Sequence, residues 1–336
     1  MKLLGALAAF VALASLWACS ASGHRSAAQS GAPASSGSTA FRASAGCGHT
    51  PVAAPGTTDV HLESGGVDRV YELDVPPSYD GSKPYAVVLD LHPLSISYKV
   101  VGAVSGFTDP PSRYDFIGVA PSGRLDGQIP FWNAAPVPDN YDVDFIDHVL
   151  DQVERTLCVD TTRIFSAGMS NGAQMSSLLA CRLSDRLAGV GAVAGVEYLA
   201  PCDGRPVPIL AFHGTADPIV LYGGGGLNAT TIANTDFYKG NLPPGLPAPL
   251  GVDESMRRWA EHNGCDPAFV EQRVSKEIRH RTWQHCKAAT ELYIVDGGGH
   301  AWPGKPEPQF EAQFGHATTD IDATALMFAF FFGQVR

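Results

Sequence analysis

The sequence has few charged residues and no excess of basic ones. Charged residues make up 17% of the 336 positions, hydrophobic residues make up 45%, and the net charge is −11. The first 45 residues include three basic residues and no acidic one, so the rest carries 20 basic against 34 acidic residues, a balance of −14. Proteins that bind nucleic acid or anionic membranes by electrostatics carry the opposite balance. We therefore expect no nucleic-acid partner.

Long hydrophobic runs and metal-binding cysteine patterns are also missing. The apolar stretch 3–16 is too short for a comfortable membrane span. No C-x-x-C or Cys/His spacing indicates a zinc site. No internal repeat and no second folded domain is evident, while the hydrophobic content is high enough for a large core. These features indicate one large folded domain with no metal or cofactor.

The N-terminal residues are typical of an export signal followed by a tether. Lys2 precedes the apolar stretch, which ends in Leu-Trp-Ala-Cys and resembles a bacterial lipobox, with Cys19 as the lipidated residue. Because Trp17 is unusual in a lipobox, ordinary signal-peptidase cleavage stays open. We assign 1–18 to a signal peptide, 19–45 to a disordered Ser/Ala/Gly-rich tether and 46–336 to a single domain. The predicted product is exported, and it is either lipid-anchored at the cell envelope or secreted.

The cysteine count agrees with export. Of seven cysteines, six remain after Cys19 is set aside. An even set in an exported chain suggests three disulfides, although six cysteines allow 15 pairings and some could be buried thiols. We expect two bridges that close short local loops and a third that ties the N-terminal segment to the region before residue 163. The expected pairs are Cys181–Cys202, Cys265–Cys286 and Cys47–Cys158.

Hydrophobic patterns alternate between strand and helix along the chain. An antiparallel pair is expected at 59–63 and 69–75, at one edge of the sheet, and nearly continuous apolar runs predict buried parallel strands. The architecture is therefore α/β with a mostly parallel twisted sheet and helices on both faces. A Gly- and Pro-rich stretch at 221–250 predicts a long loop. Further strands are expected at 85–91, 116–120, 164–167, 187–196, 208–213 and 291–295, a hairpin at 270–274 and 278–283, and helices at 142–157, 252–263 and 320–332.

The segment 163–181 carries the strongest chemical signal. A short apolar run leads into Gly-Met-Ser-Asn-Gly, and an Ala/Met/Leu-rich segment with helical spacing follows. A strand, a sharp turn with serine at its apex and a helix form the context of a G-x-S-x-G nucleophile elbow. A chance pentapeptide in an ordinary βα unit is the alternative. We predict that Ser170 is a nucleophile.

A serine nucleophile requires a histidine that accepts its proton and a carboxylate that orients this histidine. Asp217 follows the predicted strand 208–213, and His300 follows 291–295 behind three glycines. Their order after Ser170 is that of the elbow-containing hydrolases. Alternatively, Asp217 caps a turn and His300 lies at the surface. Asp203, Asp236 and Asp253 are competing acids that do not follow a strand end. Asp296 is a further competing acid, but it is too near His300 in the sequence to approach it easily from the far side.

An oxyanion hole should combine two backbone N–H groups near the serine. One donor in such sites belongs to the residue after the nucleophile, here Asn171. The other should come from the loop after strand 85–91, where Pro93 has no N–H, so Leu94 is the candidate. His92 and His213 lie at strand ends and are expected to hold loops in shape. Trp132 and Trp302 could line a substrate cleft or pack in the core.

Four motifs follow one another along the chain. They are Gly-Met-Ser-Asn-Gly-Ala-Gln-Met (168–175), Phe-His-Gly-Thr-Ala-Asp-Pro (212–218), Arg-Trp-Ala-Glu-His-Asn-Gly-Cys (258–265) and Gly-Gly-Gly-His-Ala-Trp-Pro-Gly (297–304). Together they resemble the esterase/polyhydroxybutyrate depolymerase family of α/β-hydrolases, which includes secreted feruloyl esterases. The resemblance covers residues 67–333 and implies a triad of Ser170, Asp217 and His300, together with the bridges Cys181–Cys202 and Cys265–Cys286. One departure is His-Pro-Leu at 92–94, where the family usually carries His-Gly-Cys, and it bears on the oxyanion loop and the acyl pocket.

The resulting hypothesis is an exported serine esterase that works without metal or cofactor. Feruloyl and related plant-cell-wall esters, or short polyhydroxyalkanoate esters, are the expected small or oligomeric substrates. An exported serine peptidase and a catalytically silent surface binding protein are the alternatives. The only membrane contact expected is the N-terminal lipid, and the sequence does not indicate an oligomeric state.

Overall fold

The computed structural model describes residues 41–49, 53–108, 114–126, 128–225, 250–309 and 311–333. The predicted signal peptide, Cys19, most of the predicted tether and most of the loop expected at 221–250 lie outside the described residues. Contacts group residues 39–336 into one unit. None of the described helices is long and apolar enough to cross a membrane.

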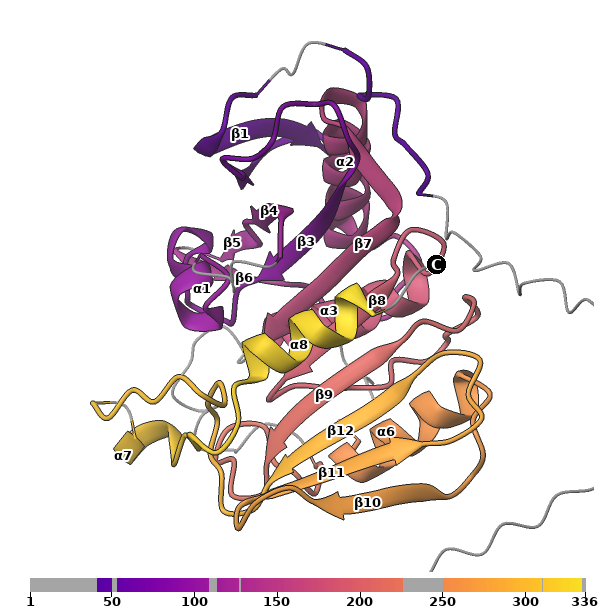
Figure 1. Cartoon of the computed structure of the whole chain (residues 1–336). Coiled ribbons are helices and arrows are strands. Elements are labelled where there is room, and N and C mark those ends of the chain that lie inside the picture. The colour runs from indigo at the N-terminus through magenta and orange to yellow at the C-terminus, as the bar shows by residue number, and fades with distance from the viewer. Residues whose placement is uncertain are drawn as a thin grey trace, which may run out of the picture. The chain divides into compact units, whose positions relative to one another are not determined.

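Ten strands of the described part form one mixed sheet in the order β1-β2-β4-β3-β7-β8-β9-β12-β11-β10 (Figure 1). Neighbours from β4 to β12 pair in parallel, which confirms the predicted parallel centre. The predicted antiparallel pair is present as β1 and β2, and the predicted hairpin, β10 and β11, makes the opposite edge antiparallel as well. The strands are β1 (Gly56–Ser64), β2 (Val67–Val75), β3 (Tyr85–Leu91), β4 (Phe116–Pro121), β7 (Val159–Met169), β8 (Gly189–Val193), β9 (Ile209–Gly214), β10 (Phe269–Arg273), β11 (Ile278–Trp283) and β12 (Thr290–Val295).

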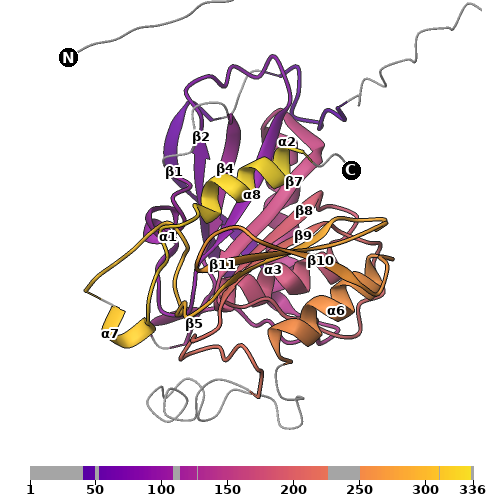
Figure 2. The same ribbon diagram turned by 60° about the horizontal axis from the view of Figure 1, so that its bottom comes forward.

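Helices cover both faces of this sheet (Figures 1 and 2). Successive side chains of a strand point to opposite faces. Accordingly, Val87 and Leu89 of β3 join the buried cluster that includes residues of α2, α3 and α6, whereas Ala86 and Val88 join the cluster that includes α8. The helices are α1 (Tyr98–Ser105), α2 (Tyr141–Thr156), α3 (Asn171–Arg182), α6 (Val252–His262), α7 (Glu311–Phe314) and α8 (Ala323–Phe332).

The predicted apolar stripe of α2 is buried against the sheet. Asn140 caps this helix by accepting hydrogen bonds from the N–H groups of Asp142 and Val143. Helix α8 is apolar on nearly all sides, because its phenylalanines pack between the sheet and neighbouring aromatic rings. Phe331 stacks on Phe165 of β7 with ring centroids 4.7 Å apart. The two helices therefore anchor opposite faces of the central strands.

Some elements differ from their predicted bounds or were not predicted. Helix α1 was missed although Ser97 caps it and Gly106 ends it with a φ of 77°. The strand expected at 187–196 ends at Val193, because Ala194 has a φ of 51°, which no strand can contain. The short hairpin of β5 (Arg124–Asp126) and β6 (Ile129–Phe131) was also missed, because strands of 3 residues are too short to show a period in the sequence.

The three predicted disulfides are formed. They join Cys47 to Cys158, Cys181 to Cys202 and Cys265 to Cys286. The first spans 111 positions and fixes the N-terminal segment next to β7, where the Ser44 N–H donates to the Val159 carbonyl at 2.9 Å. The other two each span 21 positions. A chain with three such bridges fits an oxidising compartment.

A carboxyl group lies inside the sheet, and it makes stability depend on pH. Asp90 of β3 is buried, and its Oδ2 accepts a hydrogen bond of 2.7 Å from Ser105 while its buried Oδ1 has no partner. Burial raises the pKa of Asp90 from its ordinary value of 3.8 to about 7, against the lowering effect of the Ser105 hydrogen bond. The folded protein therefore keeps a proton that the unfolded chain loses above about pH 4.

We predict that Asp90→Asn gains stability over the parent as pH rises. Between about pH 4 and 7 the folded parent binds more protons at this site than the unfolded chain, so its free energy of unfolding falls with pH. The variant lacks this group, and the difference should grow by roughly 1.4 kcal/mol per pH unit at most. Urea denaturation at pH 4, 5.5, 7 and 8 measures it. A difference that stays constant with pH would show that Asp90 does not titrate in this way.

Candidate active site

Ser170 lies at the turn between β7 and α3, as the elbow pattern predicts. Its backbone has φ 55° and ψ −120°, a conformation that costs energy for a residue with a side chain. The Ser170 N–H donates to the Val193 carbonyl at the end of β8 over 2.8 Å. A Cβ on Gly172 would lie 2.0 Å from the Leu91 carbonyl oxygen, so only glycine allows α3 to start this close to β3. The serine is 8% exposed at the C-terminal ends of the parallel strands.

Asp217 and His300 come together from two further loops. Asp217 follows β9, His300 follows β12, and the His300 Nδ1 lies 2.8 Å from the Asp217 Oδ2. The other oxygen of the carboxylate, Oδ1, accepts the N–H groups of Ile219 and Val220 at 2.8 and 2.9 Å. Asp217 therefore holds the imidazole with its Nε2 free to face a reaction partner.

A second imidazole touches the same carboxylate. The Nε2 of His213 lies 3.3 Å from the Asp217 Oδ2 and 2.9 Å from the Val220 carbonyl oxygen. Burial by itself would raise the pKa of Asp217, but the imidazoles of His213 and His300 outweigh it and hold this pKa well below its usual range. Asp217 is therefore an anion at neutral pH.

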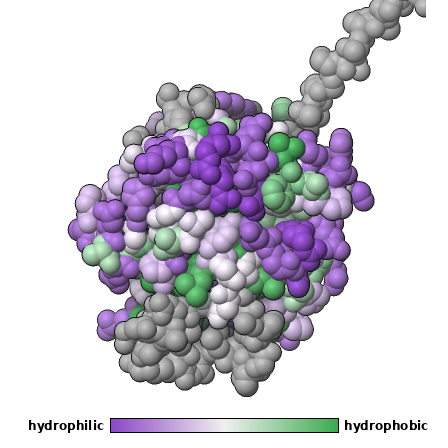
Figure 3. Space-filling view, turned by 90° about the horizontal axis from the view of Figure 1, so that it is seen from below, coloured by the Kyte–Doolittle hydropathy of each residue, from purple (hydrophilic) through white to green (hydrophobic). Residues whose placement is uncertain are grey.

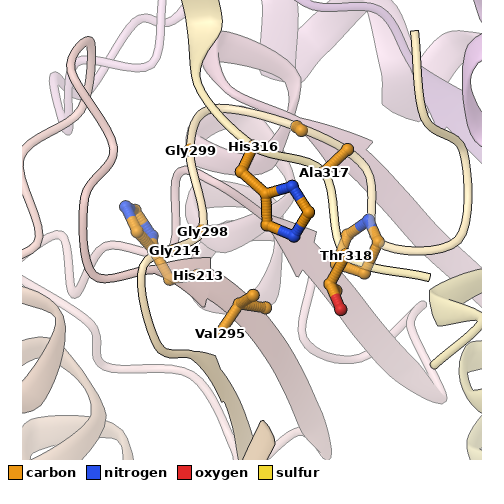
Figure 4. Close-up of a pocket in the computed structure, with 10 residues that line it drawn as sticks. His213, Gly214, Val295, Gly298, Gly299, His316, Ala317 and Thr318 are labelled. Carbon is orange, nitrogen blue, oxygen red and sulfur yellow. The ribbon is translucent and has the colours of Figure 1, made fainter. Parts of the chain in front are cut away.

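The loop that carries His300 is held by a segment that sequence patterns did not identify. The Gly299 N–H donates to the His316 carbonyl at 2.8 Å, and the His300 N–H donates to the Phe314 carbonyl at 2.6 Å. A Cβ on Gly299 would lie 2.1 Å from the Phe314 carbonyl oxygen, which explains one of the three glycines. His213 and His316 also line a pocket beside this loop, together with residues that include Gly214, Val295, Gly298 and Thr318 (Figure 4).

Within the described residues, no hydrogen bond joins the Ser170 hydroxyl to His300. Such a bond is often long or poorly aligned in a hydrolase without substrate and tightens when substrate binds. The structure thus forms the pair of His300 and Asp217 directly, and it places the serine at the end of β7, which β8 separates from β9.

The two predicted oxyanion donors are available. The N–H groups of Ser95 and Ile96 donate to the carbonyls of Pro130 and Pro93, whereas the Leu94 N–H has no acceptor among the described residues. The Asn171 N–H is at the first turn of α3, where backbone donors have no partner within the helix. Both loops meet where Gly172 packs on the end of β3.

Hydrogen bonds fix the loop around these donors. The Asn171 side chain accepts the Trp132 N–H at 2.7 Å and donates to the Trp132 carbonyl at 3.0 Å. The indole N–H of Trp132 donates to the His92 carbonyl, and the His92 Nε2 accepts the Gly123 N–H at 2.9 Å. Burial lowers the pKa of His92 to about 4, so this histidine is neutral and its Nδ1–H donates to the Pro93 carbonyl. His92 holds the loop in shape, as predicted.

Trp132 and Trp302 lie in the interior. They are 2% and 3% exposed, and the indole N–H of Trp302 donates to the Thr324 hydroxyl at 3.0 Å. These positions agree with the core-packing alternative rather than with the walls of a substrate cleft. Their buried rings are enclosed by other aromatic side chains, including His92 and Phe107.

The competing acids have other roles or lie elsewhere. Asp253 accepts from Tyr222 and Arg281, and Asp296 pairs with Arg273 and Arg279. Among the described residues no contact joins Asp203 to a histidine, and Asp236 lies outside the described residues. In the described part of the chain, no group of three or more His, Cys, Asp or Glu residues could hold a metal ion.

Comparison with known proteins identifies related sequences. No family model matches the chain. Feruloyl esterase C of Emericella nidulans is 32% identical over 272 residues, which cover 77% of this chain and 84% of the relative. Feruloyl esterase D of Neurospora crassa is 28% identical over 282 residues, covering 79% and 84% of the two chains.

Solved structures agree in fold. An acetyl xylan esterase from Aspergillus awamori matches with a TM-score of 0.54 at 14% identity, over 73% of this chain and 94% of that chain. At this identity the likeness concerns the fold alone. With the topology described above, it confirms the predicted α/β-hydrolase architecture.

We predict that Asn171→Ala lowers kcat by about tenfold, equivalent to about 1.4 kcal/mol of activation free energy. The variant keeps the backbone N–H but loses both hydrogen bonds to Trp132, so the loop next to the donors is less well fixed. Steady-state hydrolysis of a p-nitrophenyl ester measures the change, with Asn133→Ala as a nearby control that leaves the Asn171 anchor in place. An unchanged kcat would show that the anchor has no part in the reaction.

Proposed function

The chain belongs to the feruloyl esterase family, and we propose that it hydrolyses esters of hydroxycinnamic acids such as ferulic acid through Ser170, His300 and Asp217. The chain is a serine carboxylic ester hydrolase. The single observation that carries the proposed triad is the contact of 2.8 Å between the His300 Nδ1 and the Asp217 Oδ2, at the sheet edge where Ser170 occupies a strained turn. The relatives named above supply the proposed substrate class.

In the proposed reaction, Ser170 Oγ attacks the ester carbonyl carbon while the His300 Nε2 takes the hydroxyl proton. The N–H groups of Leu94 and Asn171 donate to the oxyanion that forms. When the carbon–oxygen bond breaks, His300 gives the proton to the departing alcohol and an acyl-serine remains. His300 then takes a proton from a water molecule, whose oxygen bonds to the acyl carbon. As the bond from that carbon to the Ser170 Oγ breaks, His300 gives the proton to the Oγ and the free acid departs. Asp217 stabilises the imidazolium in both steps through the Nδ1–H.

Soluble or oligomeric esters are the proposed substrates, rather than a solid polymer. On the face shown in Figure 3, hydrophilic residues dominate the described surface and apolar residues lie between them in small groups. Phe269 and Val270 of β10 are exposed, and the Arg281 guanidinium lies over the Phe269 ring at 4.5 Å. On the described part of this face, a hydrophobic solid would therefore meet little continuous apolar surface.

We predict that Ser170→Ala lowers kcat for methyl ferulate by at least about 1000-fold and abolishes labelling by a fluorophosphonate. The variant lacks the nucleophile but keeps the donors and the His300–Asp217 pair. The control is Ser177→Ala, which removes a buried hydroxyl of the same helix that donates to the Ala173 carbonyl. Labelling or turnover that survives in Ser170→Ala would contradict the assignment of the nucleophile.

The same assay tests the substrate class. The ratio kcat/KM should be higher for methyl ferulate than for acetylated xylan, hydroxybutyrate oligomers or a peptide anilide. A preference for hydroxybutyrate oligomers would replace the proposed substrate but leave the triad intact. A preference for the peptide anilide would indicate a peptidase.

We further propose that residues 1–18 direct export, that Cys19 carries a lipid and that 19–45 tether the domain at 46–336 to the cell envelope. The three disulfides support an oxidising location. Mass spectrometry of the mature N-terminus should find an acylated Cys19, and Cys19→Ala should move the enzyme from the membrane fraction to the medium. A mature chain that starts at an unmodified residue would contradict the anchor.

A further inference from the structure

We propose that His213 is a positioning residue that fixes the carboxylate of Asp217 for its contact with His300. This inference rests on the proposed function, because it assigns to His213 an effect on the reaction exerted through Asp217. The contacts that carry it lie at the end of β9 and join His213, Asp217 and Val220.

His213 is the last residue but one of β9, and its side chain is fully buried. Its Nε2 faces two acceptors, the Val220 carbonyl oxygen at 2.9 Å and the Asp217 Oδ2 at 3.3 Å. Neither acceptor can supply a proton, so the Nε2 must carry one. The Nδ1 is buried without a hydrogen-bond partner, which is consistent with the neutral Nε2–H form.

The three residues form a closed set of contacts. The Val220 N–H donates to the Asp217 Oδ1 at 2.9 Å, while the Val220 carbonyl accepts from His213. His213 therefore holds the turn after β9 through both the Val220 carbonyl and the Asp217 carboxylate. Rotation of the carboxylate would break contacts at both oxygens, so the Oδ2 stays at 2.8 Å from the His300 Nδ1.

The surroundings of His213 contain few other titratable groups. Tyr222 presents an edge to the His213 ring, with centroids 5.9 Å apart, and hydrogen-bonds Asp253, which pairs with Arg281. His316 lines the same pocket and pairs with Glu277 and Glu311 (Figure 4). In the described part of the chain, the ionisable groups that contact the Asp217 carboxylate are His300 and His213. A change at His213 should therefore reach the reaction through Asp217.

Two polar substitutions of different reach test the proposal. His213→Gln places an amide N–H about as far from the backbone as the imidazole Nε2, whereas the shorter side chain of His213→Asn cannot reach Asp217. We expect His213→Asn to lower kcat about tenfold with KM nearly unchanged. With one donor lost, the carboxylate should interact more strongly with the His300 imidazolium, so the acidic limb of kcat/KM should move to higher pH by a few tenths of a unit. His213→Gln should restore kcat to within about threefold of the parent value. It should also return the acidic limb of kcat/KM to the pH at which the parent shows it.

All rates are expressed per active site, counted by titration with diethyl p-nitrophenyl phosphate, so that a loss of folded protein does not enter kcat. His280→Leu is the matched control, because it removes a histidine that contacts Glu291 at 2.8 Å, near the start of β12 and away from the strand end that leads to His300. It should leave kcat and the acidic limb unchanged. If His213→Asn yields no folded enzyme, the pH profile of His213→Gln still tests the proposal. An acidic limb of kcat/KM displaced from that of the parent in His213→Gln would overturn it.

A double variant separates this inference from the proposed function. If His213 acts through the carboxylate, adding His213→Asn to Asp217→Asn should cost less than about threefold beyond Asp217→Asn alone. The role of His213 would be overturned if the effects of the two substitutions on kcat were fully additive. It would also be overturned if His213→Asn alone kept the parent's kcat and acidic limb. Either result would leave the triad intact. Parent activity in Asp217→Asn would overturn the triad itself, and with it this inference.

Discussion

The close approach of two backbone segments, the end of β3 and the start of α3, is the constraint on which the site depends. The contact requires a residue without Cβ at Gly172, where the Leu91 carbonyl leaves no room for a side chain. It brings the loop after β3 next to the first turn of α3, so that the free N–H groups of Leu94 and Asn171 belong to adjoining segments. The strained backbone of Ser170 is stable because strands on both sides enclose it.

Hydrogen bonds among neutral groups then give the loops their shape. His92 stays uncharged in the interior and links Pro93 to Gly123, and Trp132 links His92 to Asn171. A buried ion pair supports the same region. Asp142 accepts a hydrogen bond of 2.7 Å from Arg69 and another from the backbone N–H of Asn133, the residue after Trp132. Breaking such a pair leaves an uncompensated buried charge, so these loops are coupled to the integrity of the fold.

The sequence predicted the parts of the molecule that local patterns determine. Continuous apolar runs located the buried strands, and glycine spacing located Ser170. Position after a strand end located Asp217 and His300, since the ends of parallel strands share one edge. Patterns along the chain could not find contacts between distant segments: the bonds from Phe314 and His316 to the His300 loop, the burial of Trp132, or the approach of His213 to Asp217. The missed α1 has a cap and a terminating glycine, but its short length gave little periodicity.

The partners of Asp217 explain how a buried carboxylate can keep its charge and still act on His300. An arginine or lysine beside it would also favour the anion, but would compensate much of the field that reaches the imidazole. Instead, the described contacts of Asp217 are two backbone N–H groups and two imidazoles. Such dipolar donors stabilise the anion without cancelling its charge. The negative field therefore remains available to an imidazolium at position 300, which is the species that a serine hydrolase must stabilise in its transition state.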